Sequence, residues 1–410
     1  MSPVSPQFWI FSRYLLALGG WFVAFGIQLV LFSWLVTIVL HADPLAVGLA
    51  HVALTAPGIL LLPMGGLVSD RGNPRLLLLL YHMLHAIPPL LLALLLAVGE
   101  LSYPLLIVYA LAAGSITAFI LPTREALLPS MAGRSLPRPV ALATALQFIG
   151  QMIGIAAASQ ADRIGPLPLL LVQATLVALG ALALWRLPDP PPRSAGEPLG
   201  AWRGIAEGIA LAARSEQVWP VLLLNFGLGV FFVGPFLAVL PLVVRDVYQG
   251  GAAELAEVKL AFLVGTILAA FALTGLARNL ERRGLLIVLA IASGCVVLFW
   301  MALHPPFTLL VLLCFLWGMG GGVVITQSRT VLQIVAPSEQ RARLMALLQL
   351  GFGGGGPVGA ALIGAFASFV GLEFAVKVSA VAMAVFLAAV LALSAIWTMR
   401  TVERVADRPD

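Results

Sequence analysis

Twelve long apolar runs leave this chain very few ways to fold. Apolar runs of about 18 or more residues predict membrane-spanning helices, because about 20 helical residues cover a hydrocarbon core of about 30 Å. The runs lack the alternation of a barrel strand, and an open sheet edge in lipid would leave backbone groups unpaired. We therefore expect an all-α membrane protein with twelve transmembrane helices, at residues 14–40, 46–68, 76–99, 102–122, 139–160, 166–186, 218–244, 255–277, 284–303, 306–328, 343–370 and 373–398.

The scarce charged residues predict the orientation. Only 10% of the residues are charged and 61% are hydrophobic, whereas a soluble domain has about 25% charged residues. An even number of spans puts both ends on one side, and that side receives all but four of the 23 Lys and Arg residues; the four are Arg163, Arg245, Lys259 and Lys377. The positive-inside rule then predicts a multi-pass protein with both termini in the cytoplasm.

Several other classes of function lack support in the sequence. The net charge of +5 predicts no nucleic-acid partner, because the basic residues are spread over many short loops. We find no His-x-x-x-His or Gly-x-Ser-x-Gly pattern, so we expect no enzyme activity, no metal and no cofactor. Cys295 and Cys314 fall inside apolar runs and are expected to be packing residues. We expect a monomer in contact with membrane lipids.

The two halves of the chain repeat one another. "TREALLPSMAGRSLPRPVALATALQFIGQMIG" from Thr123 and "SRTVLQIVAPSEQRARLMALLQLGFGGGG" from Ser328 share an arginine at a helix end, a proline, a basic loop and a Gly-rich helix. Internal repeats of this length are typical of secondary transporters. We expect two pseudo-symmetric six-helix bundles at 1–186 and 218–398, a cytoplasmic linker with an amphipathic helix at 187–217, and a cytoplasmic tail at 399–410.

One short stretch, "GGLVSDRGNPR" at 65–75, resembles the loop 2-3 motif of the major facilitator superfamily, Gly-x-x-x-Asp-Arg-x-Gly-Arg-Lys. Asn73 and Pro74 depart from the motif, although Asn tolerates a left-handed turn and Pro fits a tight bend. The stretches "FILPTREALLPSM" and "RTVLQIVAPSEQRARLMALL" resemble the macrolide and siderophore exporters of that superfamily. In the second half, Asn279 stands where the motif has its aspartate.

The resemblance implies a conformational latch at this stretch. Gly66 would allow a close helix approach, and Asp70 would meet the positive N-terminus of the helix at 343–370. Arg71 or Arg75 would pair with Glu125, although a plain solvated turn is the alternative. The predicted latch residues are Gly66, Asp70, Arg71, Arg75, Arg124, Glu125, Asn279, Arg283 and Arg329.

The resemblance also implies a central cavity lined by the first, fourth, seventh and tenth helices. An aromatic and amide lining without charge suits a bulky, amphipathic or neutral small molecule. Each of these residues has ordinary packing as its alternative role. The candidate cavity residues are Gln28, Trp34, Thr117, Phe119, Asn225, Phe231, Phe232, Trp317 and Gln327.

Energy coupling is the least determined feature. No Asp or Glu lies in the middle of a predicted span, so His82 and His85 are candidates for proton coupling, with a structural role as the alternative. We expect Lys259 to extend to the membrane interface, with anion binding or charge transfer as alternatives. In the Gly-rich eleventh helix, Gly356, Pro357 and Gly359 form a flexible motif.

These features together predict a secondary active transporter that works by alternating access. The resemblance implies efflux of hydrophobic or amphipathic small molecules, drug-like or siderophore-like, with protons as a candidate coupling ion. The alternative is an importer or a lipid translocator of the same fold.

Overall fold

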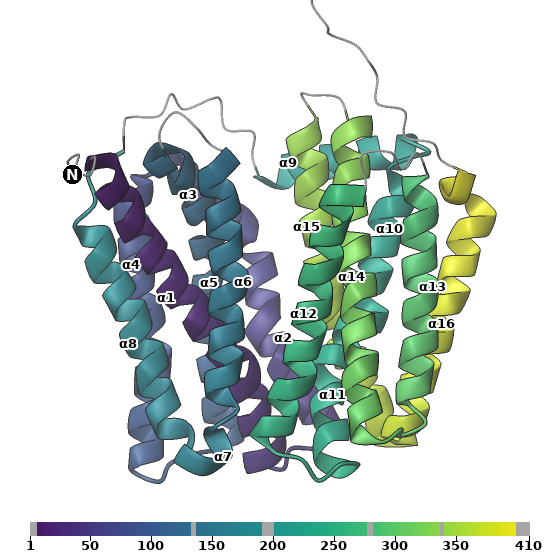
Figure 1. The fold of residues 1–410 in the computed structure, drawn as a ribbon, viewed down its shortest axis with the longest axis horizontal. Coiled ribbons are helices and arrows are strands. Elements are labelled where there is room, and N and C mark those ends of the chain that lie inside the picture. Colours follow the sequence, from purple (N-terminus) through teal and green to yellow (C-terminus); the bar gives the residue numbers. More distant parts are fainter. Residues whose placement is uncertain (1–5, 133–136, 191–200, 277–281, 337–339, 399–410) are drawn as a thin grey trace, which may run out of the picture. The chain divides into compact units, whose positions relative to one another are not determined.

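The structure is a computed structural model that describes residues 6–132, 137–190, 201–276, 282–336 and 340–398. In these ranges the regular structure is helical (Figure 1). The chain forms two compact units, and each is described by itself. The first contains residues 1–201 and 240–260, and the second contains residues 202–239 and 261–410.

The first unit is a bundle built around the first apolar helix. The start of α1 (Pro6–Trp34) and α3 (Leu62–Arg71) lie at one end of this unit, and α7 (Ala161–Ile164) lies at the other (Figure 1). Its elements are α1 (Pro6–Trp34), the π-helix η1 (Leu35–Val39), α2 (Pro44–Leu60), α3 (Leu62–Arg71), α4 (Pro74–Ala97), α5 (Tyr103–Ala132), α6 (Pro137–Ala158), α7 (Ala161–Ile164) and α8 (Pro166–Trp185), with parts of α11 (Gly234–Asp246) and α12 (Ala252–Leu276).

The second unit is likewise a bundle of helices, built from the later part of the chain. It contains α9 (Ala201–Arg214), α10 (Trp219–Leu228), the π-helix η2 (Gly229–Val233), the remaining parts of α11 and α12, α13 (Arg283–Met301), α14 (Phe307–Val335), α15 (Arg341–Val370), α16 (Leu372–Leu393) and the short 3-10 helix η4 (Ile396–Thr398). The chain crosses from one unit to the other within α11 and again within α12.

The expected twelve spans are confirmed. The described residues hold 12 helical segments that are long and apolar enough to cross a membrane. Two helices run further than the hydropathy indicated: α5 continues to Ala132 and α14 to Val335. The apolar runs end near Arg124 and Arg329, but a polar residue ends a hydrophobic stretch without ending a helix.

The bend that carries the motif stretch is tighter than expected. The helix α3 continues through Arg71, so only Gly72 and Asn73 separate it from α4. Asn73 does not adopt the left-handed conformation that asparagine tolerates, because its φ is −74°. Its side chain instead accepts hydrogen bonds from the N–H groups of Arg75 (3.0 Å) and Leu76, and Pro74 occupies the first helical turn. Asn73 is therefore an N-cap, which starts α4 directly after the bend.

The expected linker helix is present as α9. Its residue Glu207 forms an ion pair with Arg343 of α15, with 2.9 Å between Oε2 and Nη1. Gly208 faces the same helix, since a Cβ at this position would lie 2.9 Å from the side chain of Leu347. Within the second unit, α9 therefore packs along the first turns of α15.

Among the close glycine contacts of the described helices, one pair of helices in each unit is equivalent to a pair in the other. A Cβ at Gly154 of α6 would lie 2.1 Å from the carbonyl oxygen of Val23, and one at Gly26 of α1 would lie 2.2 Å from that of Gln151. In the second unit, a Cβ at Gly359 of α15 would lie 2.0 Å from the carbonyl oxygen of Val230. The first and fifth spans and the seventh and eleventh spans thus pack in the same way, as small residues allow in membranes.

Candidate functional site

The motif stretch presents its acid and its first arginine to the surface of the first unit. Asp70 and Arg71 are exposed on the last turn of α3. The glycine that packs closely within this unit is Gly65, where a Cβ would lie 2.4 Å from the carbonyl oxygen of Ala118. At Gly66 a Cβ would meet no atom within 4 Å. In this unit, Gly65 rather than Gly66 allows α3 to approach α5.

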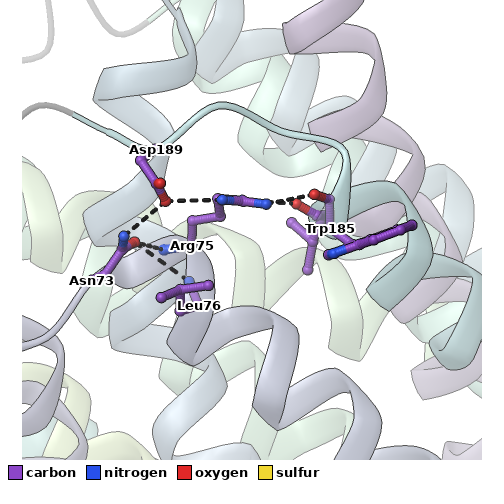
Figure 2. A network of polar contacts seen from close by, with 6 residues as sticks. Asn73, Arg75, Leu76, Trp185 and Asp189 are labelled. Atoms are coloured by element: carbon purple, nitrogen blue, oxygen red, sulfur yellow. Dashed lines mark hydrogen bonds and ion pairs between the residues drawn. The ribbon is translucent and has the colours of Figure 1, made fainter.

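Arg75 forms the centre of a polar network at the end of α8 (Figure 2). Its Nη1 lies 2.9 Å from Oδ1 of Asp189, and the guanidinium also donates to the carbonyl oxygens of Leu184 (3.2 Å) and Trp185. These carbonyls belong to the last turn of a helix, where intrahelical donors are missing. The expected pair of Arg75 with Glu125 is wrong, because the start of α4 lies beside the end of α8.

Hydrogen bonds from Arg75 and Asn73 lower the pKa of Asp189 below its ordinary value of 3.8. We expect Asp189→Asn to reduce stability slightly at neutral pH, since the side chain is mostly exposed. Because the pKa of Asp189 is lower in the folded protein than in the unfolded protein, its ionised carboxylate stabilises the fold at pH values above the unfolded-state pKa. This stabilisation is lost as the pH falls through the folded-state pKa. The difference in unfolding midpoint between wild type and variant in detergent should therefore vanish at about pH 2. An equal difference at both pH values contradicts this assignment.

The remaining latch residues have partners within their own units. Arg124 pairs with Glu125 (3.1 Å) and lies over the ring of Phe22, 4.9 Å from its centroid. In the second unit, Arg283 donates to Gln327 at 3.2 Å, and Arg329 reaches Gln349 on α15 at 3.4 Å. Asn279 lies outside the described residues.

The candidate cavity residues of the first unit differ in exposure and contacts. Gln28 is buried, Thr117 donates to the carbonyl oxygen of Ala113, and Phe119 packs 5.5 Å from the ring of Tyr81. Trp34 is buried, and its Nε1 donates to Oδ1 of Asp162 at 2.8 Å.

Two candidate cavity residues of the second unit, Phe232 and Trp317, belong to an aromatic cluster. The ring of Trp317 makes edge contacts with Phe232, Phe236 and Phe262 at 5.6 to 5.9 Å between centroids. Phe231 packs against α16, 6.0 Å from the ring of Phe386. Nearby polar positions are buried as well: Asn225 donates to Ser328 at 2.8 Å, and Gln327 has no exposed surface.

The two candidate histidines lie inside the first unit on α4. His82 and His85 are each 3% exposed, and Nδ1 of His82 lies 2.9 Å from the carbonyl oxygen of Leu78. The ring of His85 lies 6.3 Å from that of Trp21. In the second unit, the flexible motif lies inside a continuous α15, where Gly356 contacts the side chain of Val233 and Gly359 contacts backbone.

A buried polar cluster was missed because its members are far apart in sequence. Lys259 of α12 is 1% exposed, so the expectation that it extends to the membrane interface is wrong. Its Nζ donates to the carbonyl oxygen of Leu29 and, at 2.8 Å, to Oγ of Ser33. Oγ of Ser33 lies 3.2 Å from Nε2 of His51. We refer to Ser33, His51 and Lys259 as the Lys259 cluster.

A second set of contacts, at the α7 end of the first unit, was also missed. Asp162 accepts from the backbone N–H of Ala252, the first residue of α12, as well as from Trp34. Nη1 of Arg245, on α11, donates to the carbonyl oxygens of Thr37 (2.8 Å) and Ala42 (2.9 Å). These bonds attach the ends of α11 and α12 to α1 and α7. No local pattern in the sequence indicates them.

Comparison with known proteins agrees with this architecture. The nucleoside transporter NupG superposes with a TM-score of 0.74 at 15% identity, covering 94% of this chain and 98% of that one. A bacterial homolog of the human lysosomal transporter Spinster, in an inward-facing and unoccupied conformation, superposes with a TM-score of 0.68 at 16% identity, and the match covers 95% of this chain and 96% of that one. A POT family transporter in complex with 5-aminolevulinic acid superposes with a TM-score of 0.73 at 12% identity, and the match covers 94% of this chain and 96% of that one. No curated protein gives a significant sequence match.

Twelve spans in the described residues, two repeated bundles and these structural neighbours define the fold class as that of the major facilitator superfamily. Within that class, residues 4–408 match the transmembrane secretion effector family, and the chain belongs to it.

Proposed function

We propose that this protein exports hydrophobic or amphipathic small molecules across a bacterial inner membrane, with both termini in the cytoplasm. It acts by alternating access as a monomer, and its two six-helix bundles at 1–186 and 218–398 are joined by the cytoplasmic linker at 187–217. The family description as a secretion effector supports the outward direction. The latch residues at 66–75 are proposed to hold the cytoplasmic side closed in one state.

The single observation that carries the substrate class is the lack of acidic groups inside the proposed lining. The lining helices α1, α5, α10 and α14 offer aromatic rings, amides and hydroxyls, such as the cluster around Trp317 and the pair of Asn225 and Ser328. Their described carboxylate, Glu125, is exposed on α5. A pocket of this chemistry binds apolar and aromatic surface and orients it with a few uncharged hydrogen bonds.

The test is transport of ethidium and doxorubicin by purified protein in liposomes. We expect accumulation in vesicles whose protein is oriented with the cytoplasmic side outward, and we expect Asp70→Asn to reduce the rate about fivefold, as loss of a charge-to-helix contact of about 1 kcal/mol implies. Asp43→Asn, at the start of α2, is the matched exposed control. Full activity of Asp70→Asn would contradict the latch.

The same assay separates the alternative functions. Uptake of nucleosides in place of dyes would favour an importer; one structural neighbour is named a nucleoside transporter. Movement of a fluorescent phospholipid between leaflets, without dye transport, would favour a lipid translocator.

A further inference from the structure

The Lys259 cluster joins three helices through one hydrogen-bonded chain. Lys259 comes from α12, Ser33 from α1 and His51 from α2, and the three residues are 1%, 1% and 2% exposed. Nδ1 of His51 lies 2.9 Å from the carbonyl oxygen of Val47. A carbonyl can only accept, so Nδ1 carries a proton. With Nε2 unprotonated, the single hydroxyl proton of Ser33 can point either to Nε2 or to the carbonyl oxygen of Leu29, which lies 3.3 Å from Oγ. Ser33 in turn accepts from Lys259, which gives a continuous path for a proton between Lys259 and His51.

The two histidines on α4 provide an internal comparison. His82 has the same burial and the same contact as His51, with Nδ1 2.9 Å from the carbonyl oxygen four residues earlier. Its ring lies beside Gly180 of α8, whereas the ring of His51 meets a hydroxyl that also contacts a lysine. A structural histidine needs only the first contact. The contact of Nε2 with the Ser33 hydroxyl, which also binds Lys259, distinguishes His51 from His82.

The surroundings of Lys259 are poor in charge. The interior part of α1 beside it carries none, and α2 contributes His51. Acidic groups lie toward the helix ends: Glu254 and Glu257 on α12, and Asp162, which accepts from the first N–H of α12, about two turns from Lys259. On α11, Arg245 and Asp246 form an ion pair with each other. The proton balance of the cluster therefore depends mainly on its own three members.

Lys259 lies on a helix that belongs to the second half of the sequence, yet it bonds to α1 of the first half. Alternating access requires helices of the two halves to separate on one side of the membrane in one state. Separation would remove the oxygen acceptors of Leu29 and Ser33 from the ammonium, and an ammonium without partners in a membrane is costly. The contacts therefore stabilise the protonated lysine, so proton binding and formation of the contacts favour each other.

We propose that Ser33, His51 and Lys259 form the proton-binding site that couples a proton gradient to export. This inference rests on the proposed function and deepens it. One proton binds to the Lys259 amine in the attached state. As α12 begins to separate from α1, Lys259 gives this proton to Oγ of Ser33 while the Ser33 hydroxyl proton passes to Nε2 of His51, and the protonated His51 then releases a proton to water. The cluster therefore gains and loses one proton in each cycle.

The experiment compares two readouts in liposomes loaded with ethidium. One is accumulation driven by an imposed pH gradient, and the other is exchange of ethidium without a gradient. We expect Lys259→Met, Lys259→Arg and His51→Gln to lose at least about tenfold in driven accumulation and to retain exchange. Arg keeps the charge but cannot release its proton. His82→Gln, the matched control, should retain both.

Each other outcome has a definite meaning. Driven accumulation retained by Lys259→Arg would assign the lysine a purely structural charge and overturn the proposal. Loss in His82→Gln, with the cluster variants active, would move coupling to α4 and also overturn it. If neither Lys259 variant inserts, His51→Gln and Ser33→Ala decide by the same two readouts. Wild-type exchange without any gradient response overturns this inference alone, whereas absence of exchange contradicts the proposed function.

Discussion

Gly154→Ala is expected to lower the unfolding midpoint of the protein in detergent by about 2–12 °C. The added Cβ would lie 2.1 Å from the carbonyl oxygen of Val23, 2.7 Å from the nitrogen of Ile27 and 2.8 Å from Cα of Gly26. All three atoms are backbone, so a rotamer change cannot relieve the clash and α1 must move away from α6. Overpacking of this kind costs about 1–3 kcal/mol or more, and each kcal/mol corresponds to about 2–4 °C in a unit of this size.

Gly66→Ala is the matched control because it adds the same methyl group to another helical glycine. It has open space around it, and alanine is favoured over glycine in a helix by about 1 kcal/mol. We therefore expect an unchanged or slightly higher midpoint. A loss as large as that of Gly154→Ala would show that Gly66 makes the close approach that the motif resemblance implies.

Arg245→Gln is expected to break the contact between α11 and the end of the first span more often. The equilibrium constant for opening this contact should rise about tenfold or more. In the structure, Nη1 of Arg245 bonds to the carbonyl oxygens of Thr37 and Ala42. Both carbonyls lie at the end of the first span, where intrahelical donors are missing. Loss of a charged hydrogen bond costs about 1.5–3 kcal/mol, and about 1.4 kcal/mol is a tenfold change in an equilibrium.

The opening can be measured at Thr37, which has no exposed surface in this structure. The free cysteines Cys295 and Cys314, both buried, are replaced by serine, and Thr37→Cys then supplies the one thiol. We expect Arg245→Gln to raise its rate of labelling by a membrane-impermeant maleimide about tenfold. Arg163→Gln is the control, because Arg163 is exposed and bonds to its near neighbour Gln160. Equal labelling rates in the two variants would show that Arg245 does not hold this contact.

Much of the fold could be predicted from the sequence because it depends on local properties. Each span is an apolar run long enough to cross a bilayer, and a backbone in lipid must satisfy its hydrogen bonds within one helix. The linker helix α9 was indicated by its periodic apolar stripe. The repeat of Gly-rich helices predicted two bundles, and Gly154 and Gly359 make equivalent close contacts in them.

The errors came from pairs of residues distant in sequence. Arg71 or Arg75 was expected to reach Glu125, but Arg75 instead bonds to Asp189, which follows α8, and to two carbonyl oxygens in the last turn of α8. Lys259 was expected at the interface because a lone lysine in a span usually extends toward water. Its actual acceptors lie on α1, more than half the chain away.

The sequence by itself determined the number of spans, the all-helical class, the duplicated halves and the scarcity of charge inside the membrane. Hydropathy and composition carry that information within each segment. The tertiary structure alone decided that Lys259 meets Ser33 and His51, that Asp162 accepts from the start of α12, and that Arg245 bonds to the end of the first span. These contacts depend on which helix faces pack together, and many apolar faces of similar composition are locally equivalent, so only the packed bundle selects among them.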